Sequence, residues 1–155
     1  MVNNKGIVNN AFTNCSSIEE LLIPSTVSFI GEYSFNSCIY LRKITIPSSV
    51  MFIGQYAFNE CSSLKEVVIP SSVCSIEDGA FYHCTSLERV IIPSSITTIG
   101  DYAFKGCSSI KEIEIPFSVT SLGLQVFCEC ASLIEITIPS SISVIEEYSF
   151  DKCTS

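Results

Sequence analysis

The side chains with the most versatile chemistry in this sequence are nine cysteines and a single histidine. His83 directly precedes Cys84 in the stretch "FYHCTS", and Cys128 and Cys130 form a "CEC" pair. A histidine beside a cysteine could bind a metal ion or activate a thiolate, and two nearby cysteines could form a redox pair. Each of these uses depends on which side chains the fold brings close to them.

The cysteines belong to an internal repeat of 23 residues. Seven cysteines, seven phenylalanines and all six prolines keep this spacing without an insertion or deletion. Three series in one register are typical of a repeat protein. They are Cys15, Cys38, Cys61, Cys84, Cys107, Cys130 and Cys153; Phe12, Phe35, Phe58, Phe81, Phe104, Phe127 and Phe150; and Pro24, Pro47, Pro70, Pro93, Pro116 and Pro139.

Each repeat predicts two short β-segments and a turn, as in "LKEVVIPSSVCSIEDGAFYHCTS" from residue 64. The part "LKEVVIP" predicts a short strand ended by a proline, and "SVCSIE" predicts a second β-segment. The small, aromatic and thiol residues of "GAFYHC" predict one turn of 3₁₀- or α-helix. A unit this short cannot bury a core alone, so the units must stack into a solenoid. We therefore predict a single domain over residues 1–155, with a partial repeat at 7–17 and six repeats at 18–155, and it could be a fragment of a longer array.

The motif "LKEVVIP" resembles the strand half of a leucine-rich repeat, and the remainder of the unit resembles the BspA-like class of these repeats. The resemblance covers essentially the whole chain. It implies a right-handed, horseshoe-like superhelix with a concave parallel β-sheet of short strands and 3₁₀ or helical turns on the other side. It also implies a surface-displayed or secreted adhesion and recognition module, and it supplies no catalytic residues.

One position departs from the commonest leucine-rich repeat, because a hydroxyl residue replaces the usual asparagine or cysteine after the strand. These hydroxyls are expected to satisfy the loop backbone that an asparagine series usually serves. They are Thr26, Ser49, Ser72, Ser95, Ser118 and Ser141.

The repeat argues against a metal or thiolate site at His83. The equivalent positions hold unrelated residues, which indicates a side chain that points to solvent: Asn14, Ser37, Glu60, Gly106, Glu129 and Lys152. A zinc site needs about four converging ligands, whereas a cysteine ladder runs in a line. We expect its thiols to be buried and unreactive, although disulfides between neighbouring cysteines remain an alternative. Cys74, outside the series, is predicted to be the exposed thiol, and no cofactor is expected.

The strand pattern predicts an outward-facing stripe on the concave sheet, which is apolar or nearly so over its first four repeats. The stripe consists of Leu22, Thr45, Val68, Ile91, Glu114 and Thr137. Charged residues beside it could form a mixed-charge rim of a binding groove, or could simply fix the register of neighbouring repeats. The predicted rim consists of Arg42, Lys43, Lys65, Glu66, Glu88 and Arg89. A second candidate patch is formed by Phe29, Met51 and Phe52.

Composition narrows the partners further. A formal charge of −8 and a pI of about 4.5 disfavour binding to nucleic acid. No apolar stretch long enough for membrane insertion and no signal-peptide pattern are found in the sequence, while unpaired cysteines also suit the cytoplasm. We therefore predict a non-enzymatic module that binds a protein, or less favourably a glycan. The alternatives are a homo-oligomer that assembles through uncapped repeat ends, and an intracellular scaffold domain of a larger protein.

Overall fold

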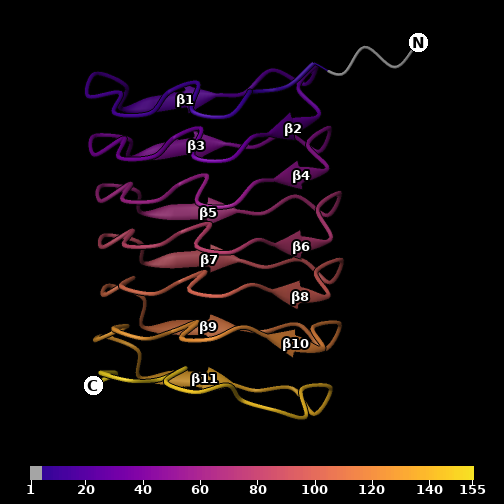
Figure 1. Ribbon diagram of the computed structural model, residues 1–155, viewed down its shortest axis with the longest axis vertical. Helices are drawn as coiled ribbons and strands as arrows, with labels where there is room; N and C mark the ends of the chain where they lie inside the picture. Colours follow the sequence, from indigo (N-terminus) through magenta and orange to yellow (C-terminus); the bar gives the residue numbers. More distant parts are fainter. Residues whose placement is uncertain (1–4) are drawn as a thin grey trace.

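The computed structural model describes residues 5–155, so residues 1–4 of the predicted domain lie outside the described part. The chain forms a β-solenoid in which each repeat makes one turn and adjacent turns stack (Figure 1). One side carries the three-residue strands β1 (Glu20–Leu22), β3 (Lys43–Thr45), β5 (Glu66–Val68), β7 (Arg89–Ile91), β9 (Glu112–Glu114) and β11 (Glu135–Thr137). Another side carries the two-residue strands β2 (Phe29–Ile30), β4 (Phe52–Ile53), β6 (Ser75–Ile76), β8 (Thr98–Ile99) and β10 (Ser121–Leu122).

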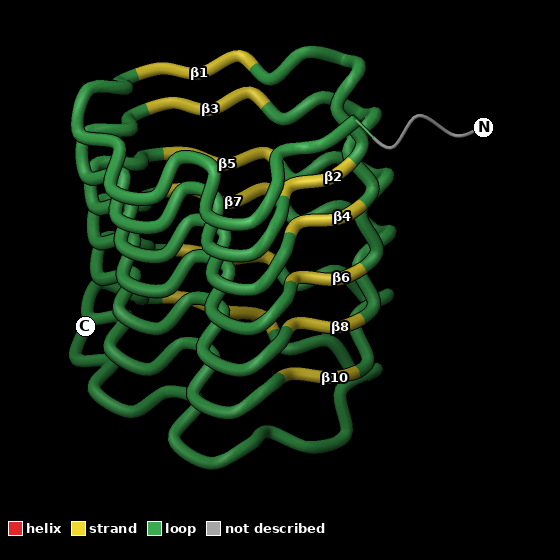
Figure 2. The backbone as a smooth tube through the Cα atoms, turned by 45° about the horizontal axis from the view of Figure 1, so that its top comes forward, coloured by secondary structure: helices red, strands yellow, loops and turns green. Residues whose placement is uncertain are grey.

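All strand pairs are parallel, and paired residues are 23 positions apart, as Val67 and Val90 are in β5 and β7. The longer strands form a sheet in the order β1-β3-β5-β7 and a separate pair of β9 and β11. The two-residue strands likewise form a β2-β4 pair and a β6-β8-β10 sheet. Within the described residues, strand pairing is therefore interrupted between β7 and β9, although the turns continue to stack (Figure 2).

A stack of phenylalanine rings runs through the centre of the solenoid. The rings of Phe58 and Phe81 lie 5.4 Å apart and within 2° of parallel, and those of Phe81 and Phe104 lie 5.5 Å apart. Both Phe81 and Phe104 are fully buried. Each ring closes the gap between two turns, and burial of such a side chain stabilises the fold by about 1.5–3 kcal/mol. The phenylalanines that recur every 23 residues therefore form a continuous stack inside the core.

The predicted helical turn does not form: residues 5–155 contain no helix. The segment that follows each two-residue strand instead makes successive tight turns, such as that closed by the bond from the Cys84 N–H to the Phe81 oxygen, 3.2 Å. Gly79 and His83 have φ angles of 58° and 53°, in the left-handed region. A right-handed helix cannot continue through such residues. The Phe81 N–H therefore donates to the Ala103 oxygen of the next repeat, at 2.9 Å.

The hydroxyl series serves the loop backbone, as expected. Ser49 donates to the backbone oxygen of Val27 at 2.7 Å, and Ser95 donates to that of Val73 at 2.6 Å, each in the preceding repeat. Ser118 differs, because its buried hydroxyl has no partner within the described part of the chain. The Ser49 and Ser95 hydroxyls thus join successive turns of the solenoid.

Candidate binding surface

The exposed side of the three-residue strands forms one continuous surface, here called the strand face. In each strand the middle residue points into the core and the two outer residues point to solvent, because side chains alternate along a strand. The strand face therefore consists of two exposed columns, Glu20, Lys43, Glu66, Arg89, Glu112 and Glu135 in one and Leu22, Thr45, Val68, Ile91, Glu114 and Thr137 in the other. The structure thus places all six predicted stripe residues in one column, and their role in binding stays a prediction.

The stripe is apolar or nearly so in the first four repeats, where Thr45 is the one hydroxyl residue, and acidic in the fifth. Leu22, Val68 and Ile91 are 73%, 51% and 38% exposed, respectively. Side chains of this kind contribute more to stability when they are covered, so an aligned exposed set marks a candidate contact surface. Beyond Ile91 the column continues with Glu114, and the neighbouring column continues with Glu112 and Glu135.

The predicted rim residues are all exposed, and some of them pair across repeats. Arg42 lies 3.5 Å from Glu19, and Arg89 lies 3.5 Å from Glu66. Exposed pairs like these are worth about 0–1 kcal/mol, because water screens both charges. They are consistent with the interpretation that the charges fix the register, and they neutralise much of the strand face between β1 and β7.

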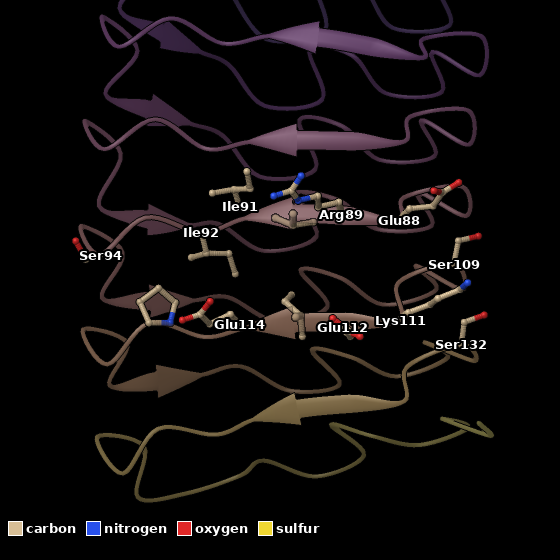
Figure 3. A pocket seen from close by; sticks show the side chains of 13 residues that line it. Glu88, Arg89, Ile91, Ile92, Ser94, Ser109, Lys111, Glu112, Glu114 and Ser132 are labelled. Atoms are coloured by element: carbon tan, nitrogen blue, oxygen red, sulfur yellow. The ribbon is translucent and has the colours of Figure 1, made fainter.

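A shallow groove opens on the strand face where strand pairing is interrupted (Figure 3). Its volume is about 1030 Å³, and Arg89 and Ile91 of β7 lie opposite Glu112 and Glu114 of β9. A second hollow of about 520 Å³ continues across β9 and β11, and the two share Glu112 and Glu114. The apolar end and the acidic end of the strand face therefore meet in a concave region, a shape suited to holding an extended ligand.

The predicted side patch is only partly available. Phe29 and Phe52 are directly paired neighbours in β2 and β4, and Met51 and Phe52 are exposed. Phe29 is half-buried, because its ring lies over Gly6, where a Cβ atom would approach the ring within 2.1 Å. The patch therefore reduces to Met51 and Phe52, which is a smaller surface than the strand face.

All nine cysteines are free, so this structure contains none of the alternative disulfides, and most thiols of the 23-residue series donate to the backbone. Sγ of Cys84 donates to the backbone oxygen of Phe58 at 3.1 Å, and Sγ of Cys107 donates to that of Phe81 at 3.1 Å. Burial raises the pKa of the Cys84 thiol to about 12. A nucleophilic or metal-binding cysteine needs a lowered pKa, so the environment of Cys84 is the opposite of an activated thiolate. Cys74 is exposed, as predicted, whereas Cys128 is buried.

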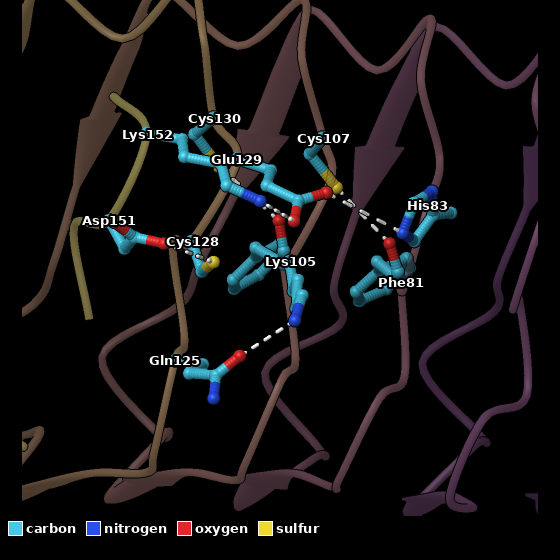
Figure 4. A network of polar contacts seen from close by, with 11 residues as sticks. Phe81, His83, Lys105, Cys107, Gln125, Cys128, Glu129, Cys130, Asp151 and Lys152 are labelled. Carbon is cyan, nitrogen blue, oxygen red and sulfur yellow. Dashed lines mark hydrogen bonds and ion pairs between the residues drawn. The ribbon is translucent and has the colours of Figure 1, made fainter. Parts of the chain in front are cut away.

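His83 takes part in a polar network that the sequence did not reveal (Figure 4). Its Nε2 lies 4.0 Å from Oε2 of Glu129, two repeats further along the chain, and Lys152 donates to Oε1 of Glu129 at 3.1 Å. The hydrogen bond from Lys152 lowers the pKa of Glu129. Gly106 makes this reach possible, since a Cβ atom there would lie 2.9 Å from the His83 ring. In the sequence, Gly106 at the position equivalent to His83 in the next repeat was the one available signal of this contact.

The network is not a metal centre. No group of three or more histidine, cysteine, aspartate or glutamate side chains within residues 5–155 is arranged to hold a metal ion. Glu129 lies beside His83 and pairs with Lys152, whose ammonium group is not a metal ligand. Residues 5–155 also contain no helix long and apolar enough to cross a membrane.

Comparison with known proteins agrees with this geometry. Residues 5–97 and 74–155 match the family model described as BspA type leucine rich repeat region, with six copies. The chain belongs to the BspA-type leucine-rich repeat family. No curated protein matches this BspA-type chain.

Solved structures of bacterial leucine-rich repeat proteins share its fold. A T. pallidum leucine rich repeat protein is 32% identical with a TM-score of 0.84, and the match covers 88% of this chain and 64% of that one. A leucine rich cell surface protein from Faecalibacterium prausnitzii is 28% identical with a TM-score of 0.70, covering 96% of this chain and 56% of that one. This BspA-type chain thus spans less than two thirds of the length of either relative. The family supports a repeat module for protein interaction.

Proposed function

We propose that this chain is a non-enzymatic binding module that recognises a protein through its strand face. The observation that carries the proposal is the exposed apolar column of Leu22, Val68 and Ile91, aligned along one side of the solenoid. Exposed aliphatic side chains in a row are unfavourable in water and favourable against a partner, so they mark the strand face as a site for contact. The Cys84 thiol and the His83 network offer no activated group for catalysis.

Two further features support this assignment. The strand face is hollowed next to Ile91, where a groove of about 1030 Å³ provides shape for a ligand. The resemblance to the Faecalibacterium prausnitzii cell surface protein supports display at a cell surface or in the secreted fraction. A protein partner is favoured over a glycan because the stripe is largely aliphatic and the charged residues Glu66 and Arg89 beside it pair with each other.

The experiment is a selection of random peptides displayed on phage against the immobilised chain. The enriched peptides are then tested against a Val68→Lys/Ile91→Lys variant, which places two charges on the apolar column. We expect binding to this variant to fall by at least about tenfold, because burying an unpaired lysine opposes contact. A Thr98→Lys/Thr120→Lys variant serves as the control, since both threonines are exposed on the side of the two-residue strands. Equal binding to both variants would show that the strand face is not the site.

A further inference from the structure

Three carboxylates on the strand face lack a basic partner. Glu112, Glu114 and Glu135 are exposed, and none of them takes part in an ion pair within residues 5–155. Glu112 and Glu135 are directly paired neighbours in β9 and β11. Like charges in this arrangement destabilise a sheet. Arg89 and Lys111 line the same groove but, within the described residues, form no ion pair with these carboxylates. The first four repeats show the contrast, because there Glu66 is paired with Arg89.

These carboxylates adjoin the apolar column. Ile91 and Glu114 occupy the same column in consecutive repeats, and both line the 1030 Å³ groove. The second hollow carries the acidic surface on to Glu135. A ligand that lies along the solenoid axis would therefore meet an apolar surface at Val68 and Ile91 and then an acidic one at β9 and β11.

We propose that the partner is an extended peptide segment in which a large apolar residue is followed by arginine or lysine residues. The proposal rests on the proposed function, since it assigns the chemistry of the ligand to the same strand face. The apolar side chain packs on Val68 and Ile91, and the basic side chains lie between Glu112, Glu114 and Glu135. This occupant satisfies both the exposed aliphatic side chains and the unpaired carboxylates, which an acidic or wholly apolar segment does not.

The spacing of the strands sets the spacing of the ligand residues. Hydrogen-bonded neighbouring strands lie about 4.8 Å apart, and β7 and β9 are not hydrogen-bonded, so the first acidic strand is at least about 5 Å and the second at least about 10 Å beyond Ile91. An extended chain advances about 3.3 Å per residue and presents every second side chain to the same side. Basic residues at the second and fourth positions lie about 7 Å and 13 Å beyond the apolar residue, and their long side chains can reach the carboxylates of β9 and β11. Arginine suits these positions better than lysine, because its planar guanidinium can bridge two carboxylates.

The long-range field of the chain favours the same partner. The formal charge of −8 attracts a basic segment before contact and raises its association rate. An acidic segment would be repelled at the strands where Glu112 and Glu135 face it. The ligand class is therefore defined by charge as well as by the apolar contact.

The experiment measures fluorescence anisotropy with a labelled seven-residue peptide. The peptide carries phenylalanine, arginine at the second and fourth positions after it, and serine elsewhere; comparison peptides replace both arginines with glutamate, or phenylalanine with serine. We expect the arginine peptide to bind about tenfold or more tightly than either comparison peptide, and to bind more weakly as salt is added. The absence of binding up to about 1 mM, or equal binding of the glutamate peptide, would overturn the proposal.

Matched variants separate local from overall charge. Glu112→Gln/Glu135→Gln removes two carboxylates from the strand face, while Glu32→Gln/Glu147→Gln removes two exposed carboxylates elsewhere. We expect the first pair to weaken binding of the arginine peptide by about tenfold, and the second pair to weaken it by less than about twofold. Equal losses would show that only net charge matters, which contradicts the assigned ligand position.

The Val68→Lys/Ile91→Lys variant distinguishes this proposal from the proposed function. Loss of binding in that variant, with no loss in Glu112→Gln/Glu135→Gln, would keep the strand face as the binding site but reject the basic partner. Unchanged binding in both would reject the strand face itself. All variants change exposed side chains, and an unchanged thermal unfolding midpoint confirms that each one is folded.

Discussion

Sγ of Cys84 donates a hydrogen bond to the backbone oxygen of Phe58, 3.1 Å away in the preceding repeat. The equivalent bond runs from Cys61 to Phe35 at 3.1 Å and from Cys130 to Phe104 at 3.3 Å. The Phe58 oxygen also accepts a hydrogen bond from the Cys61 N–H at 3.2 Å, so the Cys84 thiol of the next repeat is the second donor to the same carbonyl. The cysteines at first suggest metal or redox chemistry. Their thiols instead join neighbouring turns of the solenoid by hydrogen bonds.

This relationship predicts how the nine cysteines react with a thiol reagent. In native buffer we expect fast labelling of Cys74, slower labelling of the half-buried Cys15 and Cys153, and protection of the six buried thiols until the chain unfolds. Mass spectrometry of labelled peptides over time measures the order, and labelling in denaturant provides the reference for full accessibility. Fast native labelling of Cys84 or Cys107 would contradict the packing described for the core.

The raised pKa values of the buried thiols also predict that the folded chain loses stability at alkaline pH. Burial raises the pKa of Cys84 and of Cys130 to about 12, from an ordinary value of 9.0. Because the folded pKa lies above the unfolded one, the contribution of these thiols is fully present below pH 9 and is lost as the pH rises towards 12. Each thiol contributes about 1.4 kcal/mol of this loss per pH unit above 9.

Urea unfolding between pH 8 and pH 10.5 tests this pH dependence. Over this pH range we expect the free energy of unfolding of Cys84→Ala to fall by about 2 kcal/mol less than that of the unaltered chain. Cys74→Ala is the control, because its side chain is exposed. If Cys84→Ala and the unaltered chain lose stability in parallel, the thiol is not held in its neutral form by burial.

The phenylalanine stack predicts that replacing a phenylalanine by alanine lowers the free energy of unfolding far more inside the stack than on the surface. Phe81 is fully buried between the rings of Phe58 and Phe104, so Phe81→Ala should lower the free energy of unfolding by about 3–5 kcal/mol. Phe117 is exposed, and Phe117→Ala should change it by less than about 0.5 kcal/mol. Chemical denaturation of both variants measures the difference, and similar values for the two would contradict a continuous aromatic core.

The left-handed backbone at His83 predicts an unusual order of stability among variants at this position. His83 has φ of 53° and its equivalent in the next repeat, Gly106, has φ of 75°. We expect His83→Gly to retain the stability of the unaltered chain, and His83→Val to lose about 1–2 kcal/mol, because a β-branched residue is strained in this region. The same two substitutions at Thr98, an exposed strand residue, should give the reverse order. Thermal unfolding of the four variants compares them directly, and the same order at both positions would be inconsistent with a left-handed His83.

Much of the fold follows from the sequence, because the repeat has a constant length. When units of 23 residues stack without insertions, equivalent residues must lie in columns, and the column types then define the core. The alternation in "LKEVVIP" predicted that Val67 is buried and that Val68 is exposed, and the structure confirms both. The hydroxyl series predicted side-chain bonds to the loop backbone, such as that from Ser95 to the Val73 oxygen.

Only the tertiary structure decided where the repeats differ from one another. The interruption between β7 and β9, the groove beside it and the reach of His83 over Gly106 to Glu129 each depend on contacts between side chains of different repeats. The replacement of the helical turn by residues such as Gly79 and His83 in the left-handed region depends on hydrogen bonds to the next repeat, which no single unit contains. The sequence therefore determined the columns, because periodicity fixes them, while the packing of neighbouring turns determined the shape and charge of the surface that they present.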